Sequence, residues 1–408
     1  MSTAKKGVFS RIVGAIFLMA LSAIGPGFLT QTATFTEQFM SNFAFAILAS
    51  IIIDIGAQLN VWRVITMAKK RGHEIANAAL PGLGIVLTVL IIFGGLAFQI
   101  GNIAGAGLGF NVLLGIDVKL GAIISAVLAI IIFLMKDVGN AIGKTCQYLG
   151  IAMIILTVYI AFKSSPPVGE AVVRSVWPKD FGYGAMMFPM MTLIGGTVGG
   201  YITFAGAHRL VDDGITGKEN LGQVTKASVS GIAITGIMRI ILFLAALGVV
   251  TAGNKLTGLG GINNPAAEIF RAAAGNIGYK FFGIVLWIAA ITSVIGAAYT
   301  SVSFLRGYNK FFDKYQTQIT IGFILFATLI FIVAGKAPQV VLVSAGSLNG
   351  LILPISLGTL LFVAHKKKIM GEDYKHPLGF TIFGVIALII TLIGGYRTLG
   401  PLINMLTQ

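Results

Sequence analysis

The sequence has little charge and almost no cysteine. Only 11% of its 408 residues are charged, whereas soluble globular chains carry about 25%. The single cysteine, Cys146, excludes an intrachain disulfide framework and a cysteine metal cluster, and we interpret it as a small packing residue. This composition excludes an ordinary soluble domain.

The short motifs of common enzymes are also missing. The sequence contains no P-loop, no HExxH zinc motif and no serine-nucleophile motif. The glycine-rich stretch at 258–262 lacks the spacing and the strand–helix setting of a dinucleotide site. We therefore expect no enzyme activity and no cofactor. The first apolar segment has no persuasive cleavage site, so we expect it to be retained as a span.

Long apolar runs dominate what is present. Hydrophobic residues make up 56% of the chain, and spanning a bilayer core takes about 20 mostly apolar residues. We identify eleven apolar segments, which begin near Arg11, Phe43, Gly82, Gly121, Ala141, Tyr183, Ser228, Gly278, Thr317, Pro338 and Pro377. They predict an all-α polytopic membrane protein with a single transmembrane domain over residues 1–408.

The basic residues indicate how this protein lies in the bilayer. The net charge of +15 would suit a nucleic-acid partner, but Lys and Arg lie at segment ends instead of on one soluble face. When the junctions are assigned alternately to two sides, the side of the N-terminus holds a clear excess of Lys and Arg. Short cytoplasmic loops carry this excess. We therefore expect a plasma-membrane protein with a cytoplasmic N-terminus, an extracytoplasmic C-terminus and no nucleic-acid partner.

Two segments have the pattern of an interrupted helix. The first contains GPGFLTQTATFTEQF at 25–39, and the sixth contains GGTVGGYITFAG at 195–206, with five glycines in twelve residues. Each glycine costs roughly 1 kcal/mol relative to alanine in a helix interior. Paired interruptions in corresponding positions of two halves indicate a transporter's binding site, where unwound backbone lines a cavity. We predict non-helical backbone near Ala33–Glu37 and Val198–Tyr201.

Close helix packing is the alternative explanation of the sixth-segment glycines. Gly195 with Gly199, and Gly196 with Gly200, have the spacing at which small residues let two membrane helices approach. The matching polar run in the first segment favours a substrate site over packing alone.

Four stretches resemble motifs of the NRAMP family of metal transporters. They are IGPGFLTQTATFTEQF at 24–39, IGNIAGAGLGFNVLLG at 100–115, LIGGTVGGY at 193–201 and LPISLGTLLFVAHKKKIMG at 353–371. The family has the LeuT-type fold, so the resemblance implies two inverted five-helix repeats with helices 1 and 6 discontinuous. It places the repeats at 11–165 and 183–365 and an additional eleventh helix at 377–399.

The family's metal-binding chemistry does not carry over with the resemblance. Its first-helix motif is Asp-Pro-Gly-Asn, its sixth-helix motif is Met-Pro-His, and its third helix carries an Asp and a Glu of a proton route. The matching positions here hold Thr36, Phe39, Gly199, Gly200, Tyr201, Gln99 and Asn102. A dehydrated divalent cation needs anionic or soft ligands, and beside these positions only Glu37 is acidic. We expect no transition-metal site.

A roomy, neutral site between two helix dipoles suits a small organic solute, such as a carboxylate or an amino-acid-like compound. We predict its transport with a coupling cation, Na⁺ or H⁺. The predicted substrate-binding residues are Ala33, Thr34, Thr36, Glu37, Phe39, Gly196, Gly199, Gly200 and Tyr201. The coupling-cation candidates are Glu37, Gln99, Asn102, Thr292 and Ser293, the last two because they match hydroxyl ligands of LeuT-fold sodium symporters.

Other interpretations stay open. A divergent metal transporter would bind a hydrated divalent cation, such as Mg²⁺ or Mn²⁺, through Glu37, threonine hydroxyls and backbone carbonyls. A non-transporting membrane receptor would differ only in a flux measurement. Glu37 could equally be a solvated residue at a vestibule lip, and Asp54 and Arg239, both inside predicted spans, could pair with each other.

Overall fold

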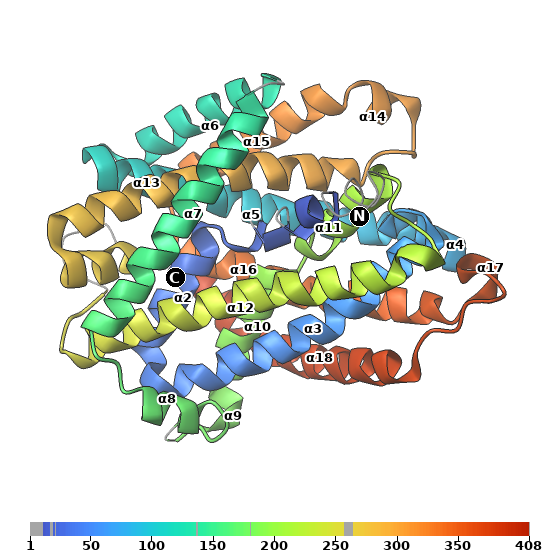
Figure 1. The fold of residues 1–408 in the computed structure, drawn as a ribbon. Helices are drawn as coiled ribbons and strands as arrows, with labels where there is room; N and C mark the ends of the chain where they lie inside the picture. The colour runs from blue at the N-terminus through green and yellow to red at the C-terminus, as the bar shows by residue number, and fades with distance from the viewer. Residues whose placement is uncertain are drawn as a thin grey trace, which may run out of the picture.

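The computed structural model describes residues 11–16, 19–20, 22–135, 138–179, 181–256 and 264–407, with the backbone alone at 138–150. Cys146 therefore lies outside the described side chains. This part of the chain is helical and contains no strand. Figure 1 shows long helices that run side by side across one bundle. The predicted all-α architecture is confirmed.

The long helices fill the bundle. They are α3 (Phe43–Ala68), α5 (Leu83–Leu114), α6 (Val118–Leu134), α7 (Val138–Lys163), α12 (Leu221–Thr251), α13 (Pro265–Ser303), α15 (Gln316–Ala334), α16 (Pro338–Ala364) and α18 (Leu378–Thr407). Shorter helices complete it: α2 (Pro26–Phe39), α4 (Gly72–Ala79), α8 (Val168–Arg174), α9 (Gly182–Ala185), α10 (Met187–Val198), α11 (Ile202–Asp212), α14 (Lys310–Lys314) and α17 (Lys367–Met370). In Figure 1, α4 and α17 lie at the right-hand end, and α8 and α9 lie beside the start of α3 at the other.

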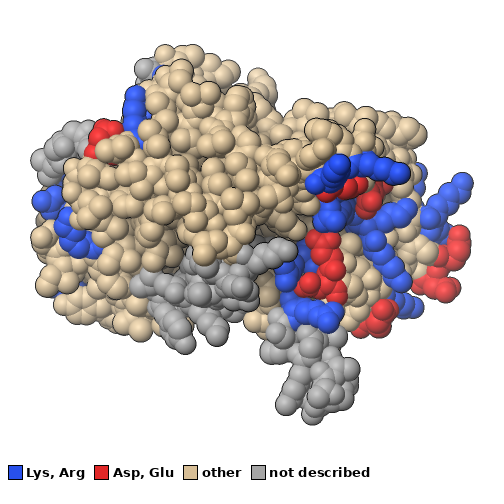
Figure 2. Space-filling view, turned by 90° about the horizontal axis from the view of Figure 1, so that it is seen from above, with Lys and Arg blue, Asp and Glu red and all other residues tan. Residues whose placement is uncertain are grey.

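The helices have the length and composition of membrane spans. Among the described residues, eight helices are long and apolar enough to cross a bilayer, or nine if the bent pair Ile151–Lys163 and Val168–Arg174 is one span. Figure 2 shows an uncharged belt between two charged ends. The protein is therefore a multi-pass membrane protein. The count of eleven spans and the repeat boundaries, which fall on either side of α8, remain predictions.

Two spans begin earlier than predicted from their apolar residues. Helix α12 starts at Leu221 instead of Ser228, and α13 starts at Pro265 instead of Gly278. Helix α13 consists of two helical segments that meet at a kink at Gly275, where φ is 62° and ψ is −156°. The apolar stretch that carries the span follows this kink.

The first span is interrupted, but the predicted place of the interruption is wrong. Helix α2 is continuous through residues 33–37, and the chain bends earlier, at Ile24 and Gly25. Gly25 has extended backbone, with φ −99° and ψ −173°, because the following Pro26 disfavours helical conformation in the residue before it. Two of the threonines that suggested a break instead bond inside the helix: the Thr32 hydroxyl donates to the Phe28 carbonyl at 2.7 Å and the Thr36 hydroxyl to the Thr32 carbonyl at 2.6 Å.

The sixth span is interrupted where the sequence predicts it. Helix α10 ends at Val198 and α11 begins at Ile202. Between them Gly199 is extended, with φ −75° and ψ 159°. Gly200 has φ +53°, in the left-handed region that glycine occupies without steric cost. The predicted break at Val198–Tyr201 is confirmed.

Candidate functional site

The break in the first span faces two polar side chains of other helices. A Cβ atom built on Gly25 would lie 3.0 Å from Ser293 Oγ of α13 and 3.5 Å from Asn102 Oδ1 of α5. Both side chains are buried. Two of the residues predicted for the coupling cation therefore meet at the bent backbone, although they are far apart in the sequence.

The break in the sixth span leads to the same place. Tyr201, directly after Gly200, is buried, and its ring packs edge-on against Phe98 of α5 with 5.7 Å between centroids. The Tyr201 hydroxyl lies beside the Asn102 side chain. Asn102 thus links the two interruptions. We call Gly25, Asn102, Tyr201 and Ser293 the central cluster.

Several polar atoms in and around the central cluster lack hydrogen-bond partners within the described structure. They are Ser293 Oγ, both amide atoms of Gln99, which lies one turn before Asn102, and Oε1 of Gln31 in α2. An unsatisfied buried polar group costs about 1–3 kcal/mol. Such groups usually bond ordered water or a ligand. These groups are neutral oxygen and amide donors and acceptors, which suit a small polar guest.

Thr292 does not join the central cluster. Its hydroxyl donates to the carbonyls of Ile288 and Ala289 in its own helix, at 3.1 and 3.0 Å. Adjacent residues of a helix point about 100° apart, so Thr292 cannot face Gly25 while Ser293 does. Of the two predicted hydroxyl ligands, the structure brings Ser293 alone to the break.

The glycines of the sixth break pack tightly against α16. A Cβ atom at Gly199 would lie 2.7 Å from the carbonyl oxygen of Asn349, and one at Gly200 would overlap Asn349 Oδ1. The Asn349 amide is fixed by donating to the carbonyls of Gly94 and Ala345, at 2.9 Å each. Close packing therefore accounts for both glycines in this conformation. Gly196 similarly leaves room for the Gln31 side chain.

The predicted substrate residues of the first span lie farther along α2. Thr34 and Phe39 line a cavity of about 470 Å³, which also contacts α10, α16 and α18. The Thr34 hydroxyl accepts a hydrogen bond from Gln339 at 3.0 Å. Thr34 lies about 13 Å from Gly25 at 1.5 Å per helical residue. This Thr34 cavity is therefore separate from the central cluster.

Three predicted residues of α2 line neither region. Ala33 is fully buried in the apolar core. The Thr36 hydroxyl is bonded inside the helix. The Glu37 carboxylate accepts a hydrogen bond from the Leu256 N–H at 2.8 Å, beyond the end of α12, so it ties a loop to α2.

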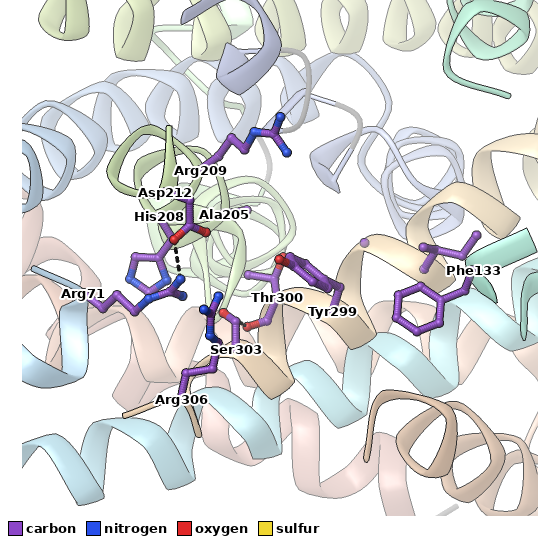
Figure 3. Close-up of a pocket in the computed structure, with 12 residues that line it drawn as sticks. Arg71, Phe133, Ala205, His208, Arg209, Asp212, Tyr299, Thr300, Ser303 and Arg306 are labelled. Atoms are coloured by element: carbon purple, nitrogen blue, oxygen red, sulfur yellow. Dashed lines mark hydrogen bonds and ion pairs between the residues drawn. The ribbon is translucent and has the colours of Figure 1, made fainter. Parts of the chain in front are cut away.

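A second cavity, of about 480 Å³, opens at the α4 end of the molecule (Figure 3). We call it the basic vestibule. It is lined by Arg71, Phe133, Ala205, His208, Arg209, Asp212, Ile295, Gly296, Tyr299, Thr300, Ser303 and Arg306. Gly296 lies three residues after Ser293 on α13, and Ala205 lies four residues after Tyr201. The vestibule thus reaches within about one helical turn of the central cluster.

The sequence did not predict this vestibule. His208 follows the sixth span in the sequence, which suggests a residue at the membrane interface. The structure shows instead that its side chain is buried. The three arginines come from three separate junctions between spans. In the sequence, each one is simply a basic residue at the end of a span. The only feature of the sequence that could have indicated the vestibule is that these junctions are assigned to the same side of the membrane.

Asp54 and Arg239 meet at Thr197, two residues before the sixth break. Arg239 Nη1 donates to Thr197 Oγ1 at 2.9 Å, and Asp54 lies beside the same hydroxyl. The guanidinium also stacks on the Phe28 ring, 4.3 Å from its centroid. The two buried side chains therefore connect α3, α10 and α12 to the start of α2.

Comparison with known proteins agrees with this architecture. Residues 16–399 match the family model Nramp, described as natural resistance-associated macrophage protein-like. The chain belongs to the Nramp family. This Nramp protein is 56% identical to the uncharacterized membrane protein YcsG of Bacillus subtilis (strain 168), over 97% of this chain and 95% of that one. It is 21% identical to the divalent metal cation transporter MntH of Yersinia enterocolitica, over 94% of each chain.

Solved structures show the fold of this Nramp protein. The Eremococcus coleocola manganese transporter has a TM-score of 0.75 at 16% identity, over 97% of this chain and 87% of that one. MhsT in complex with L-phenylalanine has a TM-score of 0.69 at 17% identity, over 95% and 98%. The predicted LeuT-type fold is confirmed, and family and fold together indicate a secondary transporter instead of an enzyme.

The observed first break changes how the Nramp motif lies on this chain. If the Pro-Gly of Asp-Pro-Gly-Asn is placed on Pro26-Gly27, at the bend, Gly25 takes the Asp position and Phe28 the Asn position. We infer this register in place of Thr36 and Phe39, because those residues lie in continuous helix. The carboxylate is absent in either register, and its place between Asn102 and Ser293 is left to a glycine.

Proposed function

We propose that this Nramp protein is a cation-coupled secondary transporter of a small organic carboxylate or an amino-acid-like solute. The observation that carries the proposal is the central cluster, where both interruptions converge on neutral polar groups and where Ser293 Oγ and the nearby Gln99 amide have no partner in the described structure. A divalent cation without its hydration shell would find no anionic or soft ligand there. A solute with several donors and acceptors would satisfy the groups that the fold leaves open.

We assign the coupling cation to the first break. Ser293 Oγ and Asn102 Oδ1 face the bent backbone at Gly25, and in transporters of this kind unwound carbonyls coordinate the coupling ion. Neutral oxygen ligands bind Na⁺ without a titrating carboxylate, so Na⁺ suits this arrangement better than H⁺. Gln99 would support the site from the neighbouring turn.

A divalent metal is the second candidate substrate, and family membership favours it. Against it, the described residues contain no group of three or more His, Cys, Asp and Glu that could hold a metal ion. A divalent cation would have to keep most of its water, as Mg²⁺ does. Mn²⁺ and Fe²⁺ bound by carboxylate and thioether groups do not fit the residues at either break.

We propose that the α4 end faces the cytoplasm. Figure 2 shows charged side chains gathered at the end where α4 and α17 lie, with fewer at the opposite end. The excess of Lys and Arg in cytoplasmic loops then places the N-terminus inside and the C-terminus outside the cell membrane. The Thr34 cavity opens toward the outside and the basic vestibule toward the cytoplasm.

Flux into proteoliposomes tests the function. Uptake of a panel of labelled carboxylates and amino acids, and of Mn²⁺, is measured with and without an inward Na⁺ gradient. We expect saturable uptake of a carboxylate-bearing solute that the gradient stimulates, and no saturable Mn²⁺ uptake. Saturable Mn²⁺ uptake would support the metal candidate instead, and ligand binding without any flux would indicate a receptor.

A further inference from the structure

The basic vestibule holds more positive than negative charge. Arg71, Arg209 and Arg306 line it together with one carboxylate, that of Asp212. Arg71 Nη2 is paired with Asp212, and Arg209 is paired with Asp213 at 3.0 Å. Within the described residues the Arg306 guanidinium makes no hydrogen bond or ion pair. Figure 3 shows Arg71 and Arg306 pointing toward the same part of the cavity, whereas Arg209 points away.

His208, which lines this cavity, has a ring nitrogen without a partner in the described structure. The backbone N–H of Gly72 donates to His208 Nε2 at 3.0 Å. Because this nitrogen accepts, the ring proton must be on Nδ1, which is buried and has no partner in the described structure. The ring is held between Phe204 and Phe304, whose centroids lie 5.5 and 4.9 Å away, so it cannot readily turn to find another acceptor.

Arg71 presents a second unused donor. Its Nη1 is buried and has no partner among the described residues. The residue is fixed at both ends, since Glu74 accepts the Arg71 backbone N–H at 2.7 Å and Asp212 holds Nη2. Arg71 is 8% exposed and His208 3% exposed. Both residues line the same cavity, beside the unpaired Arg306, and each has a buried donor without a partner in the described structure.

We propose that the basic vestibule is a binding site for a carboxylate group, formed by Arg71 Nη1, His208 Nδ1 and the Arg306 guanidinium. Buried donors require an acceptor, and two guanidinium groups directed at one space favour an anion. The site lies about one helical turn from the central cluster. Resting on the proposed function, we infer that it holds the solute's carboxylate on the cytoplasmic side of the route.

Binding of acetate to the purified full-length protein tests this site. Thermal unfolding in detergent is followed with increasing acetate, acetamide or chloride at constant ionic strength, since a ligand of the folded state raises the melting temperature. We expect acetate to stabilise the protein more than chloride does, and acetamide to have no effect. Equal effects of acetate and chloride would overturn a carboxylate site in favour of general anion binding.

Two matched variants locate the site. Arg306→Gln removes a guanidinium that no described group needs, and we expect it to weaken acetate binding about tenfold or more. Arg209→Gln removes the same charge from the same cavity, but its guanidinium is held by Asp213, so acetate binding should stay within about twofold of wild type. An equal loss of acetate affinity in both variants would show that acetate responds only to the overall positive charge of the cavity, and this result would overturn the proposal.

A measurement on wild-type protein keeps the test independent of folding. Phenylglyoxal modifies accessible arginines, and mass spectrometry identifies which ones. Acetate, but not acetamide, should protect Arg306 and leave Arg209 reactive, and the absence of such protection would overturn the site. If acetate binds in this way but no carboxylate is transported, the proposed function fails while the site stands. If a carboxylate is transported without protecting Arg306, the site fails alone.

Discussion

The central cluster and the basic vestibule lie about one turn apart and differ in almost every physical respect. The central cluster is neutral, and it is formed where two helices stop. The basic vestibule is charged and is formed between α11, the later part of α13 and the residue that precedes α4. Neutral groups at close range select a guest by shape and hydrogen bonds, whereas charges at an open mouth attract it over a longer distance. If the proposed function holds, selection of the solute and attraction of its charge are performed by different residues.

The largest effect on transport is expected when a charge is added to the neutral central cluster. Gly25→Asp places a carboxylate beside Asn102 and Ser293, in the position that the inferred register gives to the Nramp family's Asp. We expect transport of a carboxylate solute to fall at least about 100-fold, because the buried negative charge repels a second one. Gly25→Asn adds a side chain of the same size without the charge and should cost transport distinctly less.

Uptake in proteoliposomes measures the effect of these substitutions, and calorimetry with Mn²⁺ measures whether the variant gains metal affinity. Equal losses in the Asp and Asn variants would show that volume, and not charge, matters at Gly25. Undiminished uptake in Gly25→Asp would remove the central cluster from the transport route.

Removing one hydroxyl group tests which of two neighbouring residues of α13 belongs to the central cluster. Ser293→Ala deletes an oxygen that faces the first break, and we expect about a tenfold rise in the Na⁺ concentration needed for half-maximal uptake. Thr292→Ala deletes the neighbouring hydroxyl, which is bonded to its own helix. Its Na⁺ dependence should match that of wild type. Equal behaviour of the two variants in a Na⁺ titration of uptake would contradict the assignment.

How far these regions can be predicted from the sequence depends on the kind of signal. Composition gives the helical membrane architecture, and a cluster of glycines marks the sixth break because Gly200 adopts positive φ. The first break is misplaced because the threonines of α2 look like a polar interruption, although the hydroxyls of Thr32 and Thr36 bond the helix itself. A single Gly-Pro step causes the bend.

The vestibule could not be predicted because its residues do not recur at a helical or strand spacing in the sequence. Arg71 precedes α4, His208 lies in α11 and Arg306 follows α13. Each has a local explanation as a basic or polar residue at the end of a span. Only the packing of α11 against its neighbours shows that they share one cavity, and only the hydrogen bond from Gly72 defines the tautomer of His208.

The tight packing of the sixth break predicts a loss of stability instead of a filled cavity. Gly200→Ala requires positive φ for a residue with a Cβ and an overlap with Asn349, so we expect a loss of about 1–3 kcal/mol. Gly400→Ala, in α18 with open space around it, is the matched control and should be neutral or slightly stabilising. Melting curves in detergent compare the two. A Gly200→Ala variant as stable as wild type would show that the break relaxes easily and that the neighbouring space can open.

The smallest expected effect separates two of the buried histidines at the α4 end, His208 and His376. His208 has an unused ring nitrogen, whereas His376 has partners at both: Tyr374 lies 2.8 Å from Nδ1 and Asn60 lies 2.8 Å from Nε2. Burial, with the positive charge of Arg63 and the nearby His365, lowers the pKa of His376 to about 4. In the unfolded chain the pKa is about 6.5, so between these values the unfolded state binds more protons.

His376 therefore stabilises the fold fully above pH 6.5, and this contribution is lost as the pH falls toward 4. We expect the melting temperature of wild type to drop between pH 7 and pH 5, and His376→Gln to flatten this dependence because Gln keeps a donor but does not titrate. Acetate stabilisation should be unchanged in this variant, since His376 lies outside the basic vestibule. Loss of the acetate effect in His376→Gln would show that the two histidine regions are not separate. An unchanged pH profile would show that other groups control acid stability.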